Sequence, residues 1–177
     1  MEVPLNQHDV RRITGKKVKL ITPNNKDDLY ISTTKNKDSN FMIYYETKNN
    51  NGNRYGHWCG IVVKPIIREV WFFDSYGDFP DDQLENINSN FRKRSNQLNR
   101  DIGIFLYYMS TNGYKIRYND EQLQSFDKKI ATCGRYVGYF IKKNVRPEVF
   151  ADYLMNIADL QNKNTDEIIT IITNSML

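Results

Sequence analysis

The segment that most constrains the fold is 133–141, where a polar and charged loop gives way to an ordered apolar pattern. Its apolar side chains recur at the spacing of one face of an α-helix: Cys133, Tyr136, Val137, Phe140 and Ile141. The pattern predicts a largely buried helix that begins at Cys133. A thiol at a helix start meets the positive end of the helix macrodipole and unpaired backbone N–H groups, and both favour thiolate over thiol. Cys133 is therefore a candidate nucleophile.

A buried cysteine on an apolar helix face is more commonly a small core residue, so the case for Cys133 depends on the rest of the chain. The same helix carries Gly134 and Gly138, although glycine in a helix interior costs about 1 kcal/mol relative to alanine. We expect close packing or access to the backbone to be the reason for these two glycines.

Composition limits the class of protein. The 177 residues are 40% hydrophobic and 26% charged, which predicts a single globular domain over 1–177. The chain has no apolar run near the ~20 residues of a membrane span and no signal-peptide core near its start, so we expect a soluble, intracellular monomer with no membrane partner. With two cysteines and two histidines, it offers no disulfide framework and too few ligands for an ordinary closed zinc site. Neither a metal nor a cofactor is expected.

Charge leaves one class of partner open. The net charge is +4, and the positive residues gather at Arg92-Lys93-Arg94, Lys128-Lys129 and Lys142-Lys143. Such clusters permit contact with DNA, but solvated helix faces carry the same pattern. DNA binding is compatible with the composition and is not required by it.

A first helix is predicted at the N-terminus, because Asn6 can cap it and Leu5 and Val10 stand at the two positions of a hydrophobic staple. We expect this helix to end at Gly15 and to leave His8 exposed in its first turn. The segments that follow are predicted as irregular structure with brief strands over 17–31, a strand over 41–45 and a loop over 49–53.

The segments 56–63 and 69–74 predict two strands of a hairpin joined near Pro65, a residue that favours turns and interrupts strand pairing. With the hairpin centred just after Pro65, the facing pairs are His57 with Asp74, Cys59 with Phe72 and Gly60 with Trp71. Facing residues project to the same side of a sheet with Cβ atoms ~5 Å apart, so a carboxylate would stand beside an imidazole. A slip of one residue would send the two to opposite faces.

The second half of the chain predicts mainly helices. We expect a helix that opens over 79–82 and turns Leu84, Ile87 and Phe91 inward, a strand over 104–109, a turn at Asn112-Gly113 and a strand over 114–118. After the Cys133 helix, Pro147 begins another helix and Thr165 caps a last one. The order of elements predicts an α+β fold in which helices pack on a central antiparallel or mixed sheet.

Four residues combine into one chemistry: His57, Asp74 and Cys133, in that chain order, with Gln124 as the fourth. An imidazole beside a thiol takes its proton, and a carboxylate such as Asp74 orients the imidazole and stabilises its charged form. Attack on an amide carbonyl creates an oxyanion, for which the Gln124 carboxamide and the Cys133 backbone N–H are candidate donors. The set predicts a cysteine endopeptidase with a polypeptide substrate.

Cys59 is the rival nucleophile, because it lies two residues from His57 and so on the same face of the strand, about 7 Å along it. A strand interior offers neither a dipole nor an array of free N–H groups, so we favour Cys133. Asp74 has a second interpretation as the acid that ends a strand before the turn at 75–77.

At these residues the sequence resembles the adenain-like cysteine proteases, the clan of the adenovirus maturation protease and the SUMO-deconjugating proteases. Within the clan it most resembles the proteases of virophages and Polinton-like elements, which share its Asn-x-x-x-Leu-Gln and Cys-Gly-x-Tyr patterns. The resemblance spans residues 4–141 and is carried by Gly56-His57-Trp58, by 72–77, by Tyr118-Asn119 with Leu123-Gln124, and by Cys133-Gly134-Arg135-Tyr136. It implies a papain-like fold and cleavage of viral capsid precursors after small residues such as paired glycines, in the virion and at the host-cell assembly site.

The sequence departs from the pattern of the clan in two respects, and it leaves two alternative functions open. Gln124 lies nine positions before Cys133, a longer spacing than we expect for the clan, so Gln122 competes for the oxyanion role. The peptide disulfide of the adenovirus enzyme is not carried over, because the spare cysteine, Cys59, lies beside His57. The alternative functions are deconjugation of ubiquitin-like modifiers, whose tails also end in Gly-Gly, and a non-enzymatic, nucleic-acid-binding virion protein with a protease fold.

Overall fold

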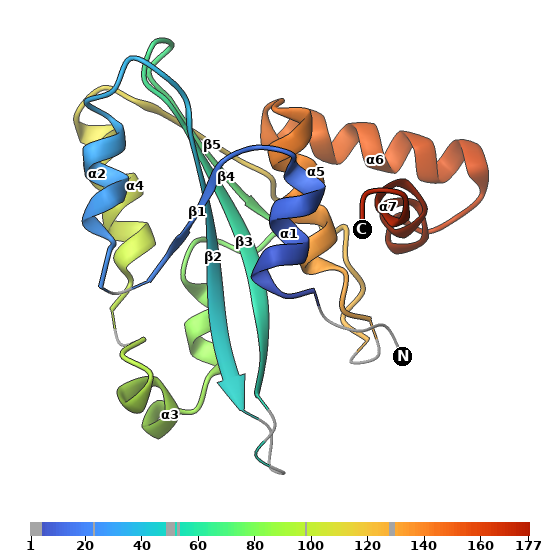
Figure 1. The fold of residues 1–177 in the computed structure, drawn as a ribbon, viewed down its shortest axis with the longest axis horizontal. Helices are drawn as coiled ribbons and strands as arrows, with labels where there is room; N and C mark the ends of the chain where they lie inside the picture. Colours follow the sequence, from blue (N-terminus) through green and yellow to red (C-terminus); the bar gives the residue numbers. More distant parts are fainter. Residues whose placement is uncertain (1–4, 23, 49–51, 53, 98, 128–129) are drawn as a thin grey trace.

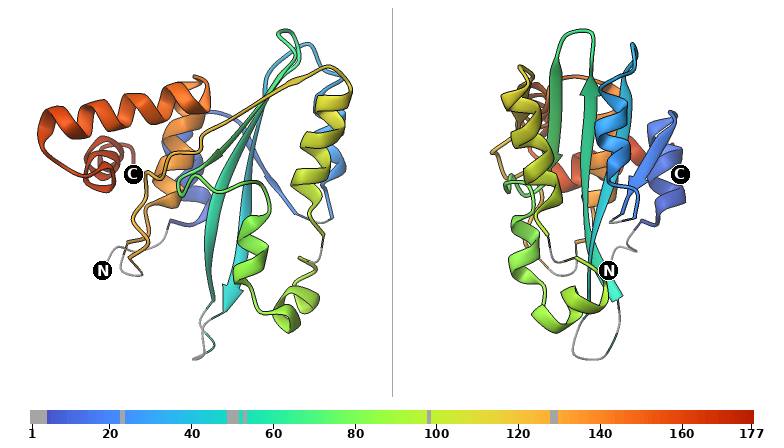
Figure 2. Two further views of the ribbon diagram at one scale, coloured as in Figure 1. Left: turned by 180° about the vertical axis from the view of Figure 1, so that it is seen from behind. Right: turned by 90° about the vertical axis from the view of Figure 1, so that its left-hand side faces the viewer.

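The computed structural model describes residues 5–22, 24–48, 52, 54–97, 99–127 and 130–177. These residues form an α+β fold in which a mixed sheet lies between two layers of helices (Figures 1 and 2). Two predicted features lie outside the described residues: the loop at 49–53, except for Gly52, and the basic pair Lys128-Lys129. Residue 4, where the resemblance to proteases begins, also lies outside them.

The sheet has five strands in the spatial order of the sequence. The outer pairs β1–β2 and β4–β5 are parallel, whereas β2–β3 and β3–β4 are antiparallel, so the sheet is mixed rather than antiparallel. The strands are β1 Val18–Ile21, β2 Ser39–Lys48, β3 Arg54–Lys64, β4 Glu69–Asp74 and β5 Lys115–Tyr118.

Helices cover both faces of the sheet, which explains why every residue of β4 is buried. The helices α1, α5, α6 and α7 lie on one side, and α2 and α4 lie on the other (Figure 1). Their bounds, with the 3₁₀-helix η1, are α1 Gln7–Thr14, α2 Asp27–Ser32, η1 Asp82–Asn86, α3 Ser89–Arg94, α4 Asp101–Thr111, α5 Cys133–Lys143, α6 Pro147–Gln161 and α7 Thr165–Asn174. Among the described residues, no helix combines the length and apolar character needed to cross a bilayer.

The N-terminal helix forms as predicted. Asn6 caps α1 by accepting hydrogen bonds from the backbone N–H groups of His8 and Asp9, and the Asp9 carboxylate accepts one from the N–H of Asn6 in return. Gly15 ends the helix in the left-handed conformation, with φ of 59°, and His8 is exposed. At the other end of the chain, Pro147 begins α6 as predicted, but Asn164 rather than Thr165 caps α7.

The predicted strand over 104–109 is wrong, because this segment belongs to α4. Its buried residues are Ile102, Phe105, Leu106 and Met109, which follow the spacing of a helix face. The aromatic residues that suggested a strand, Tyr107 and Tyr108, are exposed. The turn at Asn112-Gly113 therefore joins a helix to β5 instead of joining two strands.

The predicted continuous helix from 79–82 is also wrong, since the segment divides into η1 and α3. Asp81 adopts a left-handed backbone with φ of 69°, and its buried carboxylate accepts hydrogen bonds from the Tyr45 hydroxyl at 2.8 Å and the Gly103 N–H at 2.7 Å. This acid ties the segment to β2 and α4 rather than starting a helix. Asn88 then caps α3 through the N–H groups of the next turn.

The hairpin of β3 and β4 is present, but its register differs from the prediction by two residues. Asp74 faces Cys59 rather than His57, and Phe73 faces Gly60. The four-residue turn 65–68 ends at Arg68 with φ of 52°, which places the hairpin centre one residue later than predicted. Because the shift is even, His57 and Asp74 still project to the same face.

Candidate active site

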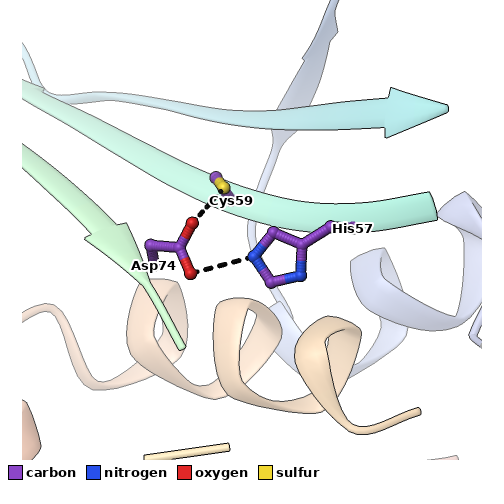
Figure 3. Close-up of side chains that lie close together, drawn as sticks. All are labelled: His57, Cys59 and Asp74. Atoms are coloured by element: carbon purple, nitrogen blue, oxygen red, sulfur yellow. Dashed lines mark hydrogen bonds and ion pairs between the residues drawn. The ribbon is translucent and has the colours of Figure 1, made fainter. Parts of the chain in front are cut away.

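His57 and Asp74 meet where β4 ends. The pairing of β3 with β4 stops at Cys59 and Asp74, so His57 extends past the end of β4. The Nε2 atom of His57 lies 2.9 Å from Oδ1 of Asp74, and both side chains are buried (Figure 3). The predicted pairing of imidazole and carboxylate is present, although it arises diagonally across the hairpin.

The backbone around Asp74 is held on both sides. Its Oδ1 atom also accepts the Tyr76 N–H at 2.7 Å. The buried Asn119 side chain accepts the Asp74 N–H at 3.2 Å and donates to the Asp74 carbonyl at 2.7 Å. The sequence marks Asn119 only as part of a motif. Its position directly after β5, which is parallel to β4, lets its buried amide bind the backbone of Asp74.

The surroundings of His57 favour its charged form. Burial alone would lower the imidazole pKa, but the negative charge of Asp74 and their hydrogen bond raise the pKa of His57 well above its ordinary value of 6.5. The nearby Cys133 thiol acts in the same direction. Since Nε2 is bound to Asp74, Nδ1 is the imidazole atom left to exchange a proton with the Cys133 thiol.

Cys133 is the first residue of α5, as predicted, and its side chain is 7% exposed. The Thr132 hydroxyl, which could cap the helix, instead donates to Asp166, so α5 has no side-chain cap. The first N–H groups of a helix have no partner within it and point outward from its start. Cys133 therefore stands at an electropositive helix end beside His57.

The glycines of α5 are explained by close packing, as predicted. A Cβ atom on Gly134 would lie 3.1 Å from Leu5 and Val10 side-chain atoms and 3.3 Å from the Trp58 ring. A Cβ atom on Gly138 would lie 2.8 Å from Cβ of Ile13. The absence of side chains at these two positions lets α1 and β3 approach α5 and fix the helix start.

Cys59 has different surroundings. It is fully buried in the core on the α4 side of the sheet, whereas Cys133 belongs to the core on the α5 side. Its thiol donates a hydrogen bond to Oδ2 of Asp74 at 3.1 Å (Figure 3). Burial, and then the negative charge of Asp74, raise the pKa of the Cys59 thiol well above its ordinary value. Cys59 thus acts as a neutral donor.

Gln124 is buried against the turn that follows β4. Its Oε1 atom accepts the Ser75 hydroxyl at 2.7 Å, and its Nε2 atom donates to the Tyr76 hydroxyl at 3.2 Å. The Tyr76 ring stacks on the His57 imidazole with 4.6 Å between centroids. Gln122, the competing residue, is exposed and donates to the Gln124 carbonyl. Tyr76 therefore connects Gln124 to His57: its hydroxyl binds Gln124, and its ring stacks on the imidazole.

Three side chains of this site have ligand atoms of the kinds that bind metals. Nε2 of His57, Sγ of Cys59 and a carboxylate oxygen of Asp74 lie within 4.8 Å of one another. These atoms hydrogen-bond with each other, and three ligands are fewer than the four of a closed structural zinc site.

No known protein-family model matches the chain. Over 133 residues, which are 75% of this chain and 71% of its relative, it is 31% identical to the "Uncharacterized protein V9" of Sputnik virophage. The chain belongs to the family of this virophage protein. It is therefore a virophage-related protein.

Solved structures give weaker likenesses. The central domain of the Lpg1148 protein from Legionella pneumophila matches 99% of this chain and 98% of its own, with a TM-score of 0.48 and 14% identity. The Legionella pneumophila effector protein RavZ matches 67% of this chain and 34% of its own, with a TM-score of 0.33 and 12% identity. At these scores neither likeness bears on function.

Proposed function

We propose that the chain is an adenain-like cysteine endopeptidase with a papain-like arrangement of its catalytic groups. One observation carries the proposal: a single buried imidazole, His57, is bound to Asp74 at 2.9 Å and lies near Cys133, the first residue of a helix. A thiol, an imidazole and an orienting carboxylate in this order form the unit that nucleophilic acyl transfer requires.

The reaction begins with the Cys133 thiolate, which attacks the carbonyl carbon of the substrate peptide. His57, protonated through Nδ1, then gives its proton to the leaving amine, and an acyl thioester remains on Cys133. Water attacks the thioester, His57 accepts a proton from it, and the carboxylic acid product leaves as Cys133 is regenerated. Asp74 holds the imidazole in position throughout, because it is bound to Nε2.

The oxyanion formed in each step needs hydrogen-bond donors. The Cys133 backbone N–H stands at the uncapped start of α5. The Gln124 carboxamide has its oxygen fixed by the Ser75 hydroxyl, so its N–H side is turned toward the Tyr76 hydroxyl beside His57. This orientation supports Gln124, rather than the exposed Gln122, as the second donor.

Aromatic rings around the helix start support a substrate with small residues. Burial and then the nearby Cys133 raise the pKa of the Tyr44 phenol. Burial also raises the pKa of the Tyr76 phenol, against the lowering effect of His57. Tyr44 also packs on Trp58, with 4.5 Å between centroids. Aromatic rings around the site would favour small substrate side chains, in keeping with the paired glycines that the protease resemblance implies.

The protein would act on capsid precursors in virus assembly. The rival function of nucleic-acid binding depends on a continuous basic surface. Within the described part of the chain, however, the clusters Arg92-Lys93-Arg94 and Lys142-Lys143 lie on α3 and at the end of α5, which are far apart (Figure 1). Such a separation favours the peptidase over a binding module.

The test is labelling with an electrophilic peptide that ends in Gly-Gly, together with cleavage of a Gly-Gly capsid precursor. Wild-type protein should be labelled at Cys133 and should cleave. Cys133→Ala should lose both activities, with cleavage falling by at least about 10³-fold, and Cys59→Ala should retain both. Labelling at Cys59, or salt-sensitive DNA binding without any labelling, would refute the proposal. Preferential cleavage of ubiquitin-like conjugates would identify a deconjugating protease instead.

A further inference from the structure

We propose that Asp166, in the first turn of α7, is a positioning residue for both donors of the oxyanion site. The inference rests on the proposed peptidase function and concerns a helix outside the region that resembles known proteases. Asp166 is buried, and α7 packs beside α5 (Figure 1). Its carboxylate bonds with groups 34 and 41 residues away, at Thr132 and Ser125.

The first contact concerns the start of α5. Threonine in the position before a helix ordinarily accepts hydrogen bonds from the first-turn N–H groups. Here the Thr132 hydroxyl donates to Oδ1 of Asp166, and the Thr132 backbone is helical, with φ of −91° and ψ of −7°. By holding this hydroxyl, Asp166 keeps the side chain of Thr132 away from the N–H groups that face the oxyanion.

The second contact concerns Gln124. Oδ2 of Asp166 accepts the N–H of Ser125 at 2.9 Å. On the other side of Gln124, the carbonyl of Leu123 accepts hydrogen bonds from the hydroxyl of Thr165, the residue before Asp166, and from the hydroxyl of Tyr136 at 3.1 Å. The start of α7 thus fixes the backbone on both sides of the glutamine.

One carboxylate therefore joins the two halves of the oxyanion site. It binds the residue before the nucleophile and the residue after the glutamine, and its negative charge lies near the positive ends of both α5 and α7. A negative charge near a thiolate does not assist its formation, so the benefit of Asp166 lies in geometry. Loss of Asp166 should therefore slow the chemical step more than it lowers the reactivity of the Cys133 thiol.

The experiment compares two rates in the full chain: hydrolysis of a Gly-Gly peptide and alkylation of Cys133 by iodoacetamide, which needs no oxyanion site. Asp166→Asn keeps one oxygen but loses the acceptor for Ser125, and we expect kcat to fall about 30- to 100-fold with KM within about threefold. Alkylation should stay within about threefold of wild type.

Matched variants separate positioning from folding. Thr132→Val should lower kcat about tenfold, and Thr132→Ser, which keeps the hydroxyl, should restore it. The double variant Asp166→Asn with Thr132→Val should be little worse than Asp166→Asn alone, because the two act as one unit. Asp152→Asn removes an exposed carboxylate from α6 and should match wild type in both rates.

An unchanged kcat in Asp166→Asn would overturn the inference. So would an equal fall in hydrolysis and alkylation, since that pattern indicates a general loss of structure, which thermal melting followed by circular dichroism would reveal. A wild-type protein that alkylates at the rate of an ordinary thiol and cleaves no peptide would refute the peptidase itself, and the role of Asp166 with it.

Discussion

The two cysteines of this protein give a comparison within one site. Both thiols are free and buried, and both lie near His57, whose partner Asp74 also accepts a hydrogen bond from Cys59. Cys133 begins a helix and has an imidazole as its partner, whereas Cys59 lies inside a strand and has a carboxylate as its partner. The imidazole can accept a proton from its thiol, whereas the carboxylate only accepts a hydrogen bond. In the proposed reaction the same side chain therefore serves as a nucleophile in one location and as a donor in the other.

The largest expected effect comes from Asp74→Asn, because Asp74 sets the state of His57 for both thiols. Without the carboxylate charge, burial dominates and the His57 pKa should fall. We expect hydrolysis to fall by about 10²- to 10⁴-fold. Imidazole resonances followed by NMR across pH would measure the His57 titration directly, with the exposed His8 as the reference signal. An unshifted His57 titration would contradict the role given to Asp74.

The same variant tests stability. A group whose pKa is raised on folding stabilises the fold fully below its unfolded pKa, and that contribution is lost as pH rises through the folded pKa. The His57 contribution should therefore be complete below about pH 6.5 and should decline at higher pH, up to and through the raised folded pKa. Urea unfolding should show this decline in wild type and a weaker one in Asp74→Asn. Equal slopes in the two proteins would show that His57 is not the group responsible.

A smaller effect is expected where α5, the helix that begins at Cys133, packs on α1 and on β3, the strand that carries Cys59. Gly138→Ala would place its Cβ 2.8 Å from Cβ of Ile13, next to the backbone of α1, and should lower the free energy of unfolding by about 1–2 kcal/mol. In Gly60→Ala on β3, the nearest atom is Cγ1 of Val137 at 3.3 Å, which can shift, so the loss should be under about 1 kcal/mol. Urea denaturation decides the order, and the reverse order would contradict the packing described for α5.

Among the site residues, the smallest effect on hydrolysis is expected for Cys59. Cys59→Ala removes one weak donor from Asp74 and should lower the free energy of unfolding by about 1 kcal/mol, with hydrolysis reduced less than about tenfold. Cys59→Ser keeps a donor at this position and should recover most of the lost activity. A loss in Cys59→Ala as large as that in Asp74→Asn would mean that the two cysteines had been given the wrong roles.

The sequence predicts elements well where capping and periodicity agree. Asn6 and Gly15 bound α1, and the apolar spacing after Cys133 predicts α5 from its first residue. It misleads where composition and periodicity disagree, as in 104–109, where aromatic residues suggest a strand but the helical spacing of the apolar residues decides. The hairpin shows a third case, in which the register is wrong by two residues and the side-chain face is nonetheless right.

The candidate site likewise contains residues that the sequence identifies and residues whose roles it does not show. His57, Asp74 and Cys133 are recognisable from the sequence because a predicted hairpin joins the first two and the third begins a predicted helix. The roles of Asn119 and Asp166 are not, since each depends on hydrogen bonds to residues distant in the chain. A motif can mark such residues, but only the packing of β5 beside β4 and of α7 beside α5 shows what they hold.

The closure of the site imposes an order of events on the proposed reaction. The imidazole of His57 is only 6% exposed and the Cys133 side chain only 7%, and Asp74 and Tyr76 occupy two sides of the ring. An imidazole enclosed in this way leaves water little access to Nδ1 while the amine fragment is still bound. The amine fragment must diffuse away before a water molecule can take its place, and the acylated intermediate persists for as long as that exchange takes.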